Sequence, residues 1–262
     1  MQTAKNEIQI VKIGGNIVGD KKRLEAFLLH FAAIKGKKIL VHGGGKLATE
    51  MAEKLNIPAQ MVNGRRITDE PTLDIITMVY GGLVNKKIVA VLQQYNCNAL
   101  GLSGADINCI RADKRPVTDL DYGFAGDISE VNAKQLIALL EAGISPVLCP
   151  ITHDKKGQLL NTNADTIASE TAIALAEHYK SVLTYCFEKA GVLENVENED
   201  SVITHIDSSK YKQLLNNGII SEGMLPKLHN CFHALENGVD RVCIGNEKMI
   251  SEQQPTFSLL TL

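Results

Sequence analysis

The chain has 262 residues and a formal net charge of -3, with 27 Lys and Arg residues against 30 Asp and Glu residues. This length allows one large α/β domain or two smaller ones, and the charge balance lacks the basic excess of nucleic-acid-binding proteins. No uncharged apolar run approaches the roughly 18 residues of a membrane span. Lys5, Glu7 and Lys12 interrupt the region where a signal peptide needs apolar residues. We therefore expect a globular cytoplasmic protein that binds neither nucleic acid nor membrane.

The cysteines and histidines do not form a metal-site pattern. The six cysteines stand at least twelve residues apart and include no Cys-x-x-Cys pair, so we expect buried thiols. His229 and His233 could share one helix face, but the segment lacks the glutamate of a catalytic zinc helix and a third ligand nearby. Surface histidines are the favoured interpretation, and we expect no metal site formed by the protein.

The first 58 residues contain a strand, a glycine turn and a helix twice in succession. Each strand is a short apolar run, and the first helix carries apolar residues at helical spacing. The first unit is 8–13, Gly14-Gly15 and 21–34, and the second is 38–42, Gly43-Gly44-Gly45 and 47–55. Two such units predict parallel strand pairing in an α/β sheet.

The alternation of helices and strands continues toward the C-terminus. Helices are predicted over residues 71–95, 132–142, 164–179, 208–216 and 225–236. Strands are predicted over 98–102, 108–111, 144–149, 181–186, 241–244 and 257–262, the last one antiparallel at a sheet edge. Between them lie a polar loop over 153–163 and a turn-like segment over 187–205 with an acidic rim of Glu194, Glu197, Glu199 and Asp200. The best candidate for a domain break falls around 153–179.

The two glycine turns are the first indication of function. A glycine-rich link between strand and helix exposes backbone N–H groups where phosphate or carboxylate is favoured. Neither turn has the G-x-G-x-x-G sequence of a dinucleotide site, and Leu40 stands where a P-loop needs its first glycine. The turns therefore predict an anion site that is neither a nicotinamide site nor a P-loop. Glycines that serve only tight turns remain the alternative.

Lys12 lies inside the first apolar run, shortly before Gly14-Gly15. Burying its ammonium group would cost several kcal/mol unless an anion or another partner meets it. At the carboxyl end of a central strand, it would point into the crevice where open α/β sheets bind ligands. The alternative is an edge strand from which the side chain reaches water.

Three further segments place polar groups at predicted loop-to-helix junctions, where α/β enzymes often carry active-site residues. They are 63–68, 161–165 and 223–227. Taken singly, Asn163 and Asp165 are also good capping residues, and Pro226 suits a first helical turn. Together with the glycine turns, these segments supply the lysines, arginines and aspartate that suit phosphoryl transfer.

Seven short motifs, in order along nearly the whole chain, resemble those of the acetylglutamate kinases in the amino-acid kinase superfamily. They are Lys12-Ile13-Gly14-Gly15, His42-Gly43-Gly44-Gly45, Asn63-Gly64-Arg65-Arg66-Ile67-Thr68, Val84-Asn85-Lys86, Gly101-Leu102-Ser103-Gly104, Asn161-Thr162-Asn163-Ala164-Asp165 and Gly223-Met224-Leu225-Pro226-Lys227. The resemblance implies a three-layer αβα sandwich with a mainly parallel, open central sheet. It also implies one domain over 1–262, with an acylglutamate-binding lobe over about 1–178 and a nucleotide-binding lobe over about 179–262.

The activity that the resemblance implies is ATP-dependent phosphorylation of the γ-carboxylate of an N-acyl-L-glutamate, in arginine biosynthesis. On the nucleotide side, Lys12 and Lys227 would neutralise the phosphoryl group in transit, with Gly14 and Gly15 at the phosphates. Asp165 would orient both lysines. Because no cluster of carboxylates stands ready for Mg²⁺, the ATP phosphates would hold most of the ion's coordination.

On the acceptor side, the resemblance implies that Gly44 and Gly45 present backbone N–H groups to the reacting group. Arg66 would form a fork to the substrate α-carboxylate, for which guanidinium geometry is well suited. Asn161 would hydrogen-bond the substrate. No covalent enzyme intermediate is implied.

One segment departs from the family pattern, in which the strand after the Asn-x-Asn-Ala-Asp helix ends in Leu-Thr-Asp-Val-x-Gly. This chain has Leu183-Thr184-Tyr185-Cys186 there, followed by a longer turn to Gly191. The aspartate is replaced, so the contacts to ATP are expected to differ from those of the family.

Two alternatives remain: a related kinase for aspartate, glutamate, carbamate or a nucleoside monophosphate, and a non-catalytic relative. Lys12, Asp165 and Lys227 argue against the non-catalytic relative, because folding does not require those charges. Arg66 argues against acceptors that lack an α-carboxylate. The acyl group is acetyl by default, but a succinyl group is also possible if Arg65 pairs with its extra carboxylate rather than being a surface arginine.

The resemblance also bears on assembly. Arginine-inhibited members of the family carry an extra N-terminal helix, whereas only seven residues precede the first predicted strand here. We therefore expect an arginine-insensitive homodimer, joined through the helix over 71–95 and its neighbouring strand, with a monomer as the alternative.

Overall fold

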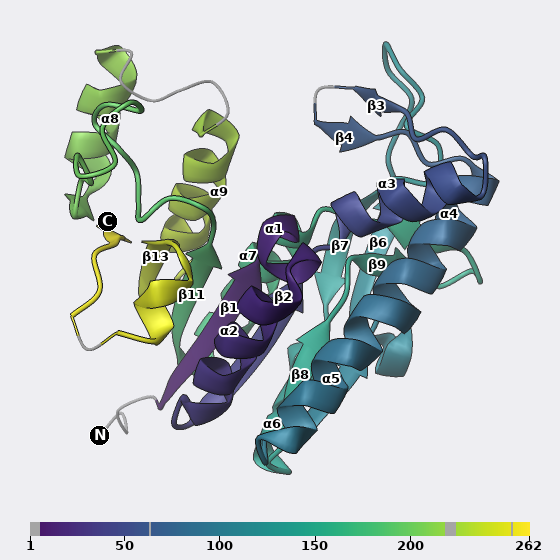
Figure 1. The fold of residues 1–262 in the computed structure, drawn as a ribbon, viewed down its shortest axis with the longest axis horizontal. Coiled ribbons are helices and arrows are strands. Elements are labelled where there is room, and N and C mark those ends of the chain that lie inside the picture. The colour runs from purple at the N-terminus through teal and green to yellow at the C-terminus, as the bar shows by residue number, and fades with distance from the viewer. Residues whose placement is uncertain (1–5, 63, 218–223, 253) are drawn as a thin grey trace.

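A computed structural model describes residues 6–62, 64–217, 224–252 and 254–262. Its centre is an eight-stranded sheet with helices on both faces (Figure 1). In order across the sheet, the strands are β12 (His205–Ile206), β14 (Ser258–Leu260), β13 (Arg241–Gly245), β11 (Lys180–Cys186), β1 (Glu7–Ile13), β2 (Lys37–His42), β8 (Ser145–Leu148) and β5 (Ala99–Leu102). All neighbours pair in parallel except β13 and β14, so the predicted open, mainly parallel sheet is confirmed.

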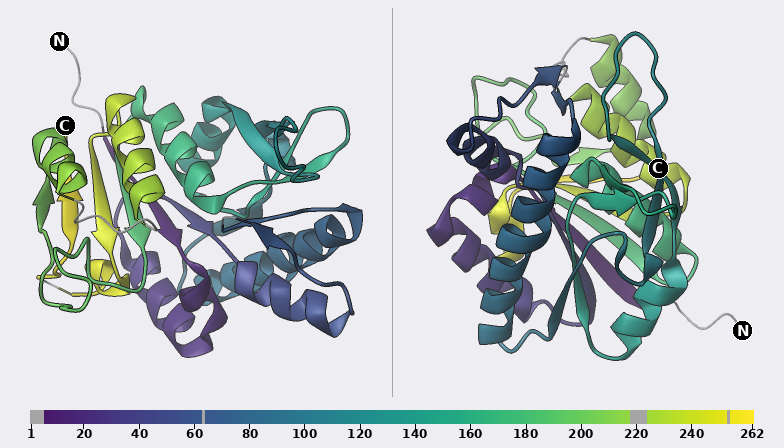
Figure 2. Two further views of the ribbon diagram at one scale, coloured as in Figure 1. Left: turned by 90° about the horizontal axis from the view of Figure 1, so that it is seen from above. Right: turned by 90° about the vertical axis from the view of Figure 1, so that its right-hand side faces the viewer.

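Helices cover both faces of this sheet and complete the three layers of the predicted sandwich (Figure 2). One face carries α1 (Gly15–Gly19), α2 (Lys21–Ala33), α3 (Gly45–Lys54), α4 (Glu70–Ile76), a π-helical segment (Thr77–Val84) and α5 (Asn85–Gln94). The other face carries α6 (Ala133–Glu141), α7 (Ala164–Ala176) and α9 (Leu225–Glu236), while α8 (Ser208–Asn216) follows β12. Two short 3₁₀ helices span Asp106–Asn108 and Glu247–Ile250.

The residues of β1 show how the two faces are built. Successive side chains of a strand point to opposite faces, so Ile8 and Ile10 pack in the core beneath α7 and α9, and Val11 and Ile13 pack beneath α2. All four are fully buried, and each contributes roughly 1.5–3 kcal/mol relative to an exposed side chain. Lys12 follows the spacing of Ile8 and Ile10, which places it on the face of α7 and α9.

Two smaller sheets lie beyond the central one. A four-stranded sheet contains β10 (Leu159–Asn161), β9 (Ile151–His153), β6 (Ile110–Lys114) and β7 (Gly126–Val131), and a hairpin contains β3 (Met61–Val62) and β4 (Arg65–Arg66). The strand predicted over 108–111 therefore belongs to the four-stranded sheet and not to the central one. The loop predicted over 153–163 includes β10, a short strand that apolar periodicity did not mark.

The long helix predicted over 71–95 runs from Glu70 to Gln94 without a break. Its start is well defined, because the side chain of Asp69 accepts a hydrogen bond from the backbone N–H of Thr72. Its π-helical middle was not predicted, since the apolar pattern does not distinguish the two helix types. By length and composition alone this helix could cross a membrane, yet 44% of its most apolar window is buried against the core.

The last predicted strand is confirmed as antiparallel to its neighbour, since β14 runs against β13. Its predicted position at the sheet edge is wrong, because β12 lies outside it. β12 has only two residues, too few for a sequence pattern, and it lies at the end of the segment predicted as a turn. The acidic rim over 194–200 is exposed, as predicted.

The thiols largely follow the prediction. All six cysteines are free, five of them buried and Cys243 half-buried. His229 and His233 are both exposed on α9, which confirms their assignment to the surface. The first strand begins at Glu7, one residue earlier than predicted. Of the seven residues expected ahead of it, 1–5 lie outside the described residues, as do Asn63 and Gly223 of the sequence motifs.

Candidate active site

Lys12 lies near the carboxyl end of β1, a strand paired on both sides. The alternative of an edge strand is therefore wrong. Lys12 is only 7% exposed, and its Nζ atom is 2.6 Å from Oδ1 of Asp165. The ion pair supplies the partner that a buried ammonium group needs, because an unpaired charge at this position would be strongly destabilising.

Asp165 stands in the first turn of α7, where the helix dipole favours a carboxylate. Asn163 caps this helix, as its Oδ1 accepts hydrogen bonds from the backbone N–H groups of Asp165 at 2.7 Å and Thr166 at 3.4 Å. The hydroxyl of Tyr185 donates to the backbone carbonyl of Asp165 at 3.0 Å. The capping role that the sequence allowed for Asn163 is thus what fixes Asp165 in place.

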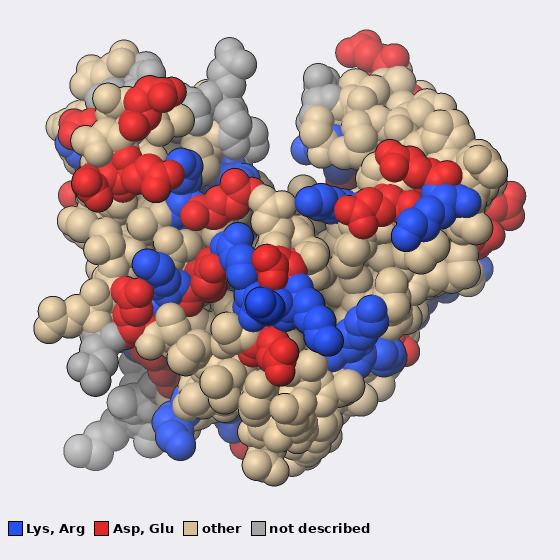
Figure 3. Space-filling view, viewed as in Figure 1, with Lys and Arg blue, Asp and Glu red and all other residues tan. Residues whose placement is uncertain are grey.

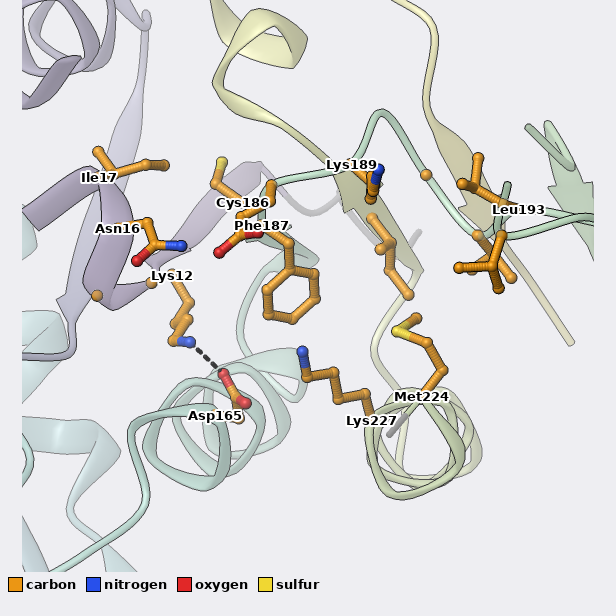
Figure 4. Close-up of a pocket in the computed structure, with 17 residues that line it drawn as sticks. Lys12, Asn16, Ile17, Asp165, Cys186, Phe187, Lys189, Leu193, Met224 and Lys227 are labelled. Carbon is orange, nitrogen blue, oxygen red and sulfur yellow. Dashed lines mark ion pairs between the residues drawn. The ribbon is translucent and has the colours of Figure 1, made fainter. Parts of the chain in front are cut away.

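Lys227 comes from the first turn of α9 and points toward the same region (Figure 4). Its Nζ atom lies 3.9 Å from the centroid of the Phe187 ring. Burial is the main cause that lowers the pKa of Lys227, the charge of Asp165 raises it, and the charge of Lys12 lowers it further. Among the described residues, no carboxylate lies within ion-pair distance of this ammonium group.

Lys12, Asp165 and Lys227 converge on a cavity of about 520 Å³ (Figure 4). Gly14 and Gly15 line the same cavity, at the turn between β1 and α1. The rest of the wall is largely apolar and includes Ile17, Val192, Leu193, Val196, Met224 and Ile244. The cavity thus combines a cationic end with a wall that could accept a flat apolar ring.

The two glycine turns lie side by side, because the backbone N–H of Gly43 donates to the carbonyl of Ile13 at 3.1 Å. The turn of β2 leads into α3, whose first residue is Gly45. A Cβ atom on Gly44 would lie only 2.9 Å from the ring of Tyr80, so only glycine allows this approach of the turn to the π-helical segment. The opening turn of α3 leaves its first backbone N–H groups without helical partners, as an anion site requires.

Three of the four predicted acceptor-side residues, Gly45, Arg66 and Asn161, are connected by hydrogen bonds. Nη2 of Arg66 donates to the carbonyl of Gly45 at 3.0 Å and to Oγ1 of Thr49 at 2.7 Å. Nδ2 of Asn161 donates to Oγ1 of Thr68 at 2.9 Å, and Thr68 Oγ1 donates to the carbonyl of Arg66 at 3.3 Å. Nη1 of Arg66 is buried and has no hydrogen-bond partner in the described part of the chain. This orphaned donor is what a carboxylate ligand would satisfy.

The predicted site residues therefore fall into two groups. Lys12, Gly14, Gly15, Asp165 and Lys227 line the cavity. The acceptor-side residues do not line it. The turn that carries Gly44 and Gly45 begins at Gly43, which adjoins the cavity-lining turn at Gly15. Arg65, the candidate partner of a succinyl carboxylate, is exposed on β4, whereas its neighbour Arg66 is only 9% exposed.

Sequence reasoning missed two aromatic residues of the site. Tyr185 is the register partner of Lys12 on β11, and Phe187 extends the same side of the chain two residues later. The two rings stack with centroids 5.8 Å apart and planes 5° from parallel. Alternate residues of a strand share one face, so Tyr185 and Phe187 lie on the same face as Leu183. This would have placed both rings on the α7 and α9 face, once β11 was known to pair with β1.

A buried polar network supports the turn after β2. The ring of His42 is fully buried, with Nδ1 2.8 Å from the carbonyl of Gly43 and Nε2 3.1 Å from Nδ2 of Asn85. Since a carbonyl only accepts, Nδ1 carries the proton and Nε2 accepts from Asn85. Asn85 also donates to the carbonyl of Val147 at 2.9 Å, and Lys86 Nζ lies 3.2 Å from Asn85 Oδ1. The motif that begins at His42 and the motif that contains Asn85 and Lys86 are thus linked by hydrogen bonds that stabilise the turn.

The surface near the cavity carries mixed charge. A second, open depression shares Asn16 and Glu188 with the cavity and is lined by Lys21, Lys22 and Lys46. Figure 3 shows lysine and arginine side chains beside carboxylates across this face, below a hollow between the two upper parts of the molecule. In the described residues, no group of three or more His, Cys, Asp or Glu side chains could hold a metal ion.

Comparison with known proteins identifies the family. Residues 7–246 match the model of the amino acid kinase family. The acetylglutamate kinase of Parabacteroides distasonis is 53% identical over 250 residues, covering 95% of this chain and 98% of its own. That of Phocaeicola vulgatus is 54% identical over 252 residues, with 96% and 98% covered. Among solved structures, smu.665 from Streptococcus mutans UA159 matches with a TM-score of 0.76 and 26% identity, covering 97% of this chain and 98% of its own. The chain therefore belongs to the amino acid kinase family, with acetylglutamate kinases as its relatives.

Proposed function

We propose that the chain is an ATP-dependent kinase that phosphorylates the γ-carboxylate of an N-acyl-L-glutamate, N-acetylglutamate by default, in arginine biosynthesis. The observation that carries the proposal is the convergence of Lys12, Asp165 and Lys227 on one cavity beside two glycine turns. The acetylglutamate kinases that match over nearly the whole chain supply the choice of acceptor.

The reaction needs positioning and positive charge more than covalent chemistry. An oxygen of the acceptor carboxylate attacks the γ-phosphorus of ATP, the bond to the β,γ-bridging oxygen breaks, and ADP leaves with that electron pair. Lys12 and Lys227 supply two cations for the phosphoryl oxygens, and Asp165 holds Lys12 through their ion pair. The backbone N–H groups of Gly44 and Gly45 stabilise negative charge on the acceptor side.

The nucleotide occupies the cavity in this proposal, with its phosphates toward Gly14, Gly15 and the two lysines. The apolar wall then meets the base or ribose. Mg²⁺ accompanies ATP, and the donor set suits an ion held mainly by the phosphates, since Asp165 is already paired with Lys12 and Glu188 is the only other carboxylate among the described lining residues. Its chemistry would be to neutralise phosphate charge.

Arg66 holds the acceptor in this proposal. Its Nη2 is fixed by Gly45 and Thr49, so the free Nη1 has a defined direction and can pair with the substrate α-carboxylate. Asn161, fixed by Thr68, donates to or accepts from the rest of the acceptor. N-succinylglutamate is the second candidate acceptor, with the exposed Arg65 as the partner of its extra carboxylate.

The proposal extends to the working form of the protein. We propose an acylglutamate-binding lobe over about 1–178 and a nucleotide-binding lobe over about 179–262, which share the eight-stranded sheet. Exposed Met78 and Leu83 on the long helix and Leu100 on the edge strand β5 support a homodimer through this side. Six free thiols suit the reducing cytoplasm, which is the proposed location. The proposed reaction requires no contact with nucleic acid or membrane.

Initial rates of ADP release against a panel of acceptors test this function. The panel is N-acetylglutamate, N-succinylglutamate, glutamate, aspartate, carbamate and UMP, each with ATP and Mg²⁺. We expect an N-acylated glutamate to give the highest kcat/KM. A higher value for free glutamate, aspartate, carbamate or UMP, or no acceptor-dependent ADP release at all, would contradict the proposal.

A further inference from the structure

The ring of Phe187 lies close to the ammonium groups of both cavity lysines (Figure 4). Nζ of Lys227 is 3.9 Å from the ring centroid, and Nζ of Lys12 is 5.3 Å from it. Both distances are within the range of a cation–π contact, and the first is close. Phe187 is half-buried and lines the cavity, so the ring forms part of the surface that the reacting groups would meet.

Two ammonium groups share one carboxylate at this end of the cavity. Asp165 forms its ion pair with Lys12, which leaves Lys227 without an ion-pair partner in the described part of the chain. Burial disfavours the charged form of Lys227, and the nearby charge of Lys12 disfavours it further. Asp165 and Glu188 attract Lys227 only from beyond ion-pair distance. The face of an aromatic ring carries partial negative charge, so Phe187 adds an attraction in direct contact with the ammonium group.

A ring differs from a carboxylate in a way that suits phosphoryl transfer. A second carboxylate would hold Lys227 more strongly, but it would cancel the positive charge and repel the phosphates. A ring attracts the ammonium group without formal charge, so the full positive charge stays available to the phosphoryl oxygens. The ring also fixes a flexible four-carbon side chain in one direction.

We infer that Phe187 is a positioning residue, whose ring holds the ammonium group of Lys227, and less closely that of Lys12, charged and directed into the cavity. This inference rests on the proposed kinase function and adds a residue to it. Phe187 acts through the lysines and forms no bond with the reacting atoms.

The surroundings of the ring keep it in place. Tyr185 stacks against Phe187, and the hydroxyl of Tyr185 is hydrogen-bonded to the backbone of Asp165. Tyr185 is also the register partner of Lys12 across the β1–β11 pair. The stacked rings therefore connect β1, β11 and the first turn of α7, which are the elements that set the distances among the three charged groups.

Graded fluorination of Phe187 tests the inference, because each added fluorine weakens the negative face of the ring and changes its shape little. We expect kcat to fall stepwise with mono-, di- and trifluorophenylalanine, and Phe187→Leu to lower it roughly two- to thirtyfold, the range from an exposed to a desolvated cation–π contact. Phe187→Trp, which keeps a stronger ring face, should retain more activity than Phe187→Leu. The KM for N-acetylglutamate should stay within about twofold of wild type, since its binding residues are in the other group.

The pH profile of kcat separates this role from simple packing. Losing the ring's attraction lowers the pKa of Lys227, so the loss of activity at high pH should begin at a lower pH in Phe187→Leu. The charged or titratable groups that act on Lys227 are Asp165, Lys12, Glu188 and Cys231, and none of them is changed in this variant. A side chain that only filled space would leave the profile where it is.

Phe31 provides a matched control. Its ring is 5.3 Å from Nζ of Lys38, a cation–π contact near the opposite end of the central strands. The same fluorinated residues at position 31 should leave kcat and its pH profile unchanged. If fluorination at 187 likewise has no effect in an enzyme that phosphorylates N-acetylglutamate, Phe187 has no positioning role while the function stands. If the wild-type protein phosphorylates no acceptor, the function itself fails.

Discussion

At the scale of single residues, the site is defined by an excess of positive charge. Lys12 and Lys227 face the same cavity as Asp165, and only Lys12 is within ion-pair distance of that carboxylate. Burial lowers the pKa of Lys227, which means that holding its charge at this position costs free energy. A phosphoryl group bound between the lysines would offset this cost, because its negative charge stabilises both ammonium groups.

Removing either lysine should therefore reduce turnover with little loss of fold. We expect Lys12→Ala and Lys227→Ala each to lower kcat on the order of a hundredfold or more, because each removes positive charge that is already in place for the transition state. Steady-state kinetics with saturating N-acetylglutamate measure this. Lys180→Ala, which removes an exposed cation from the other end of β11, should keep wild-type turnover. Near wild-type turnover in Lys12→Ala or Lys227→Ala would contradict the mechanism.

Arg66→Ala should act mainly on substrate binding. The guanidinium group would hold the α-carboxylate similarly in the ground state and the transition state, so its loss should raise KM for N-acetylglutamate on the order of tenfold or more and change kcat less. Titrating the acceptor at saturating ATP separates the two constants. Arg111→Ala, which removes a partly exposed arginine paired with Glu130 on the four-stranded sheet, is the control. An unchanged KM in Arg66→Ala would show that the α-carboxylate binds elsewhere.

The sequence indicated most of these residues, though not their contacts. Lys12 was indicated by its apolar surroundings alone, and Asp165 and Lys227 by their place in motifs. Their roles stay predictions. Phe187 was not indicated, because its contact with Lys227 depends on how β11 and α9 pack. The fixing of Arg66 by Thr49 likewise depends on a turn of α3 that lies 17 residues away along the chain.

At the scale of elements, a buried polar network stabilises the turn after β2. His42 ends β2, and Asn85 begins α5 directly after the π-helical segment. Burial lowers the pKa of His42 to about 4, so the ring stays neutral and keeps its proton on Nδ1 for the carbonyl of Gly43. The glycine turn and the long helix are thereby fixed to each other at the point where the acceptor would bind.

This network predicts a pH dependence of stability. An unfolded histidine takes up a proton near its ordinary pKa of 6.5, while folded His42 resists until about pH 4, so the unfolded state binds more protons between these values. Stability from this residue is complete above pH 6.5 and falls as the pH drops toward 4, by about 2 kcal/mol at roughly pH 5.

Urea denaturation at about pH 7.5 and pH 5 checks this prediction. The loss of stability between the two pH values should be about 2 kcal/mol smaller in His42→Gln than in wild type. The exposed His178→Gln, beyond the end of α7, should behave as wild type. An equal loss in His42→Gln and wild type would show that His42 is protonated in the folded state.

Among the elements, those with strong periodicity were predicted well. α8 and α9 have the predicted bounds, and the glycine turns and buried strands of the first 58 residues are confirmed. The errors lie where pairing partners decide the structure. β6 and β10 are short, and only tertiary pairing assigns them to the four-stranded sheet. β12 has two residues, and both pair with residues of β14, a strand that lies more than 50 residues later in the chain.

At the scale of the whole molecule, three of the exposed apolar residues lie on the long helix and on the edge strand β5. Met78 is 56% exposed and Leu83 is 38% exposed on the long helix, and Leu100 is 39% exposed on β5, which ends the central sheet. A helix whose outer face is apolar at Met78 and Leu83, and the edge of the central sheet, both suit a second copy of the chain. A twofold axis at this side would bury them in both copies.

We therefore expect Leu83→Asp to shift the protein from dimer to monomer, because a carboxylate would be buried at the proposed interface. Light scattering at micromolar concentration measures the change in mass. Leu215→Asp, which alters a similarly exposed leucine on α8, should leave the mass unchanged. A wild-type monomer, or a Leu83→Asp protein that stays a dimer, would contradict this mode of assembly.

The proposed reaction transfers a phosphoryl group from ATP to the side-chain carboxylate of an N-acylglutamate. Hydroxylamine converts the acyl phosphate so formed into a hydroxamate, which mass spectrometry can locate. With ATP, Mg²⁺ and N-acetylglutamate, we predict one γ-hydroxamate for each ADP released, and almost none with Lys227→Ala. Release of ADP without hydroxamate, or a hydroxamate on the α-carboxyl group, would contradict the account.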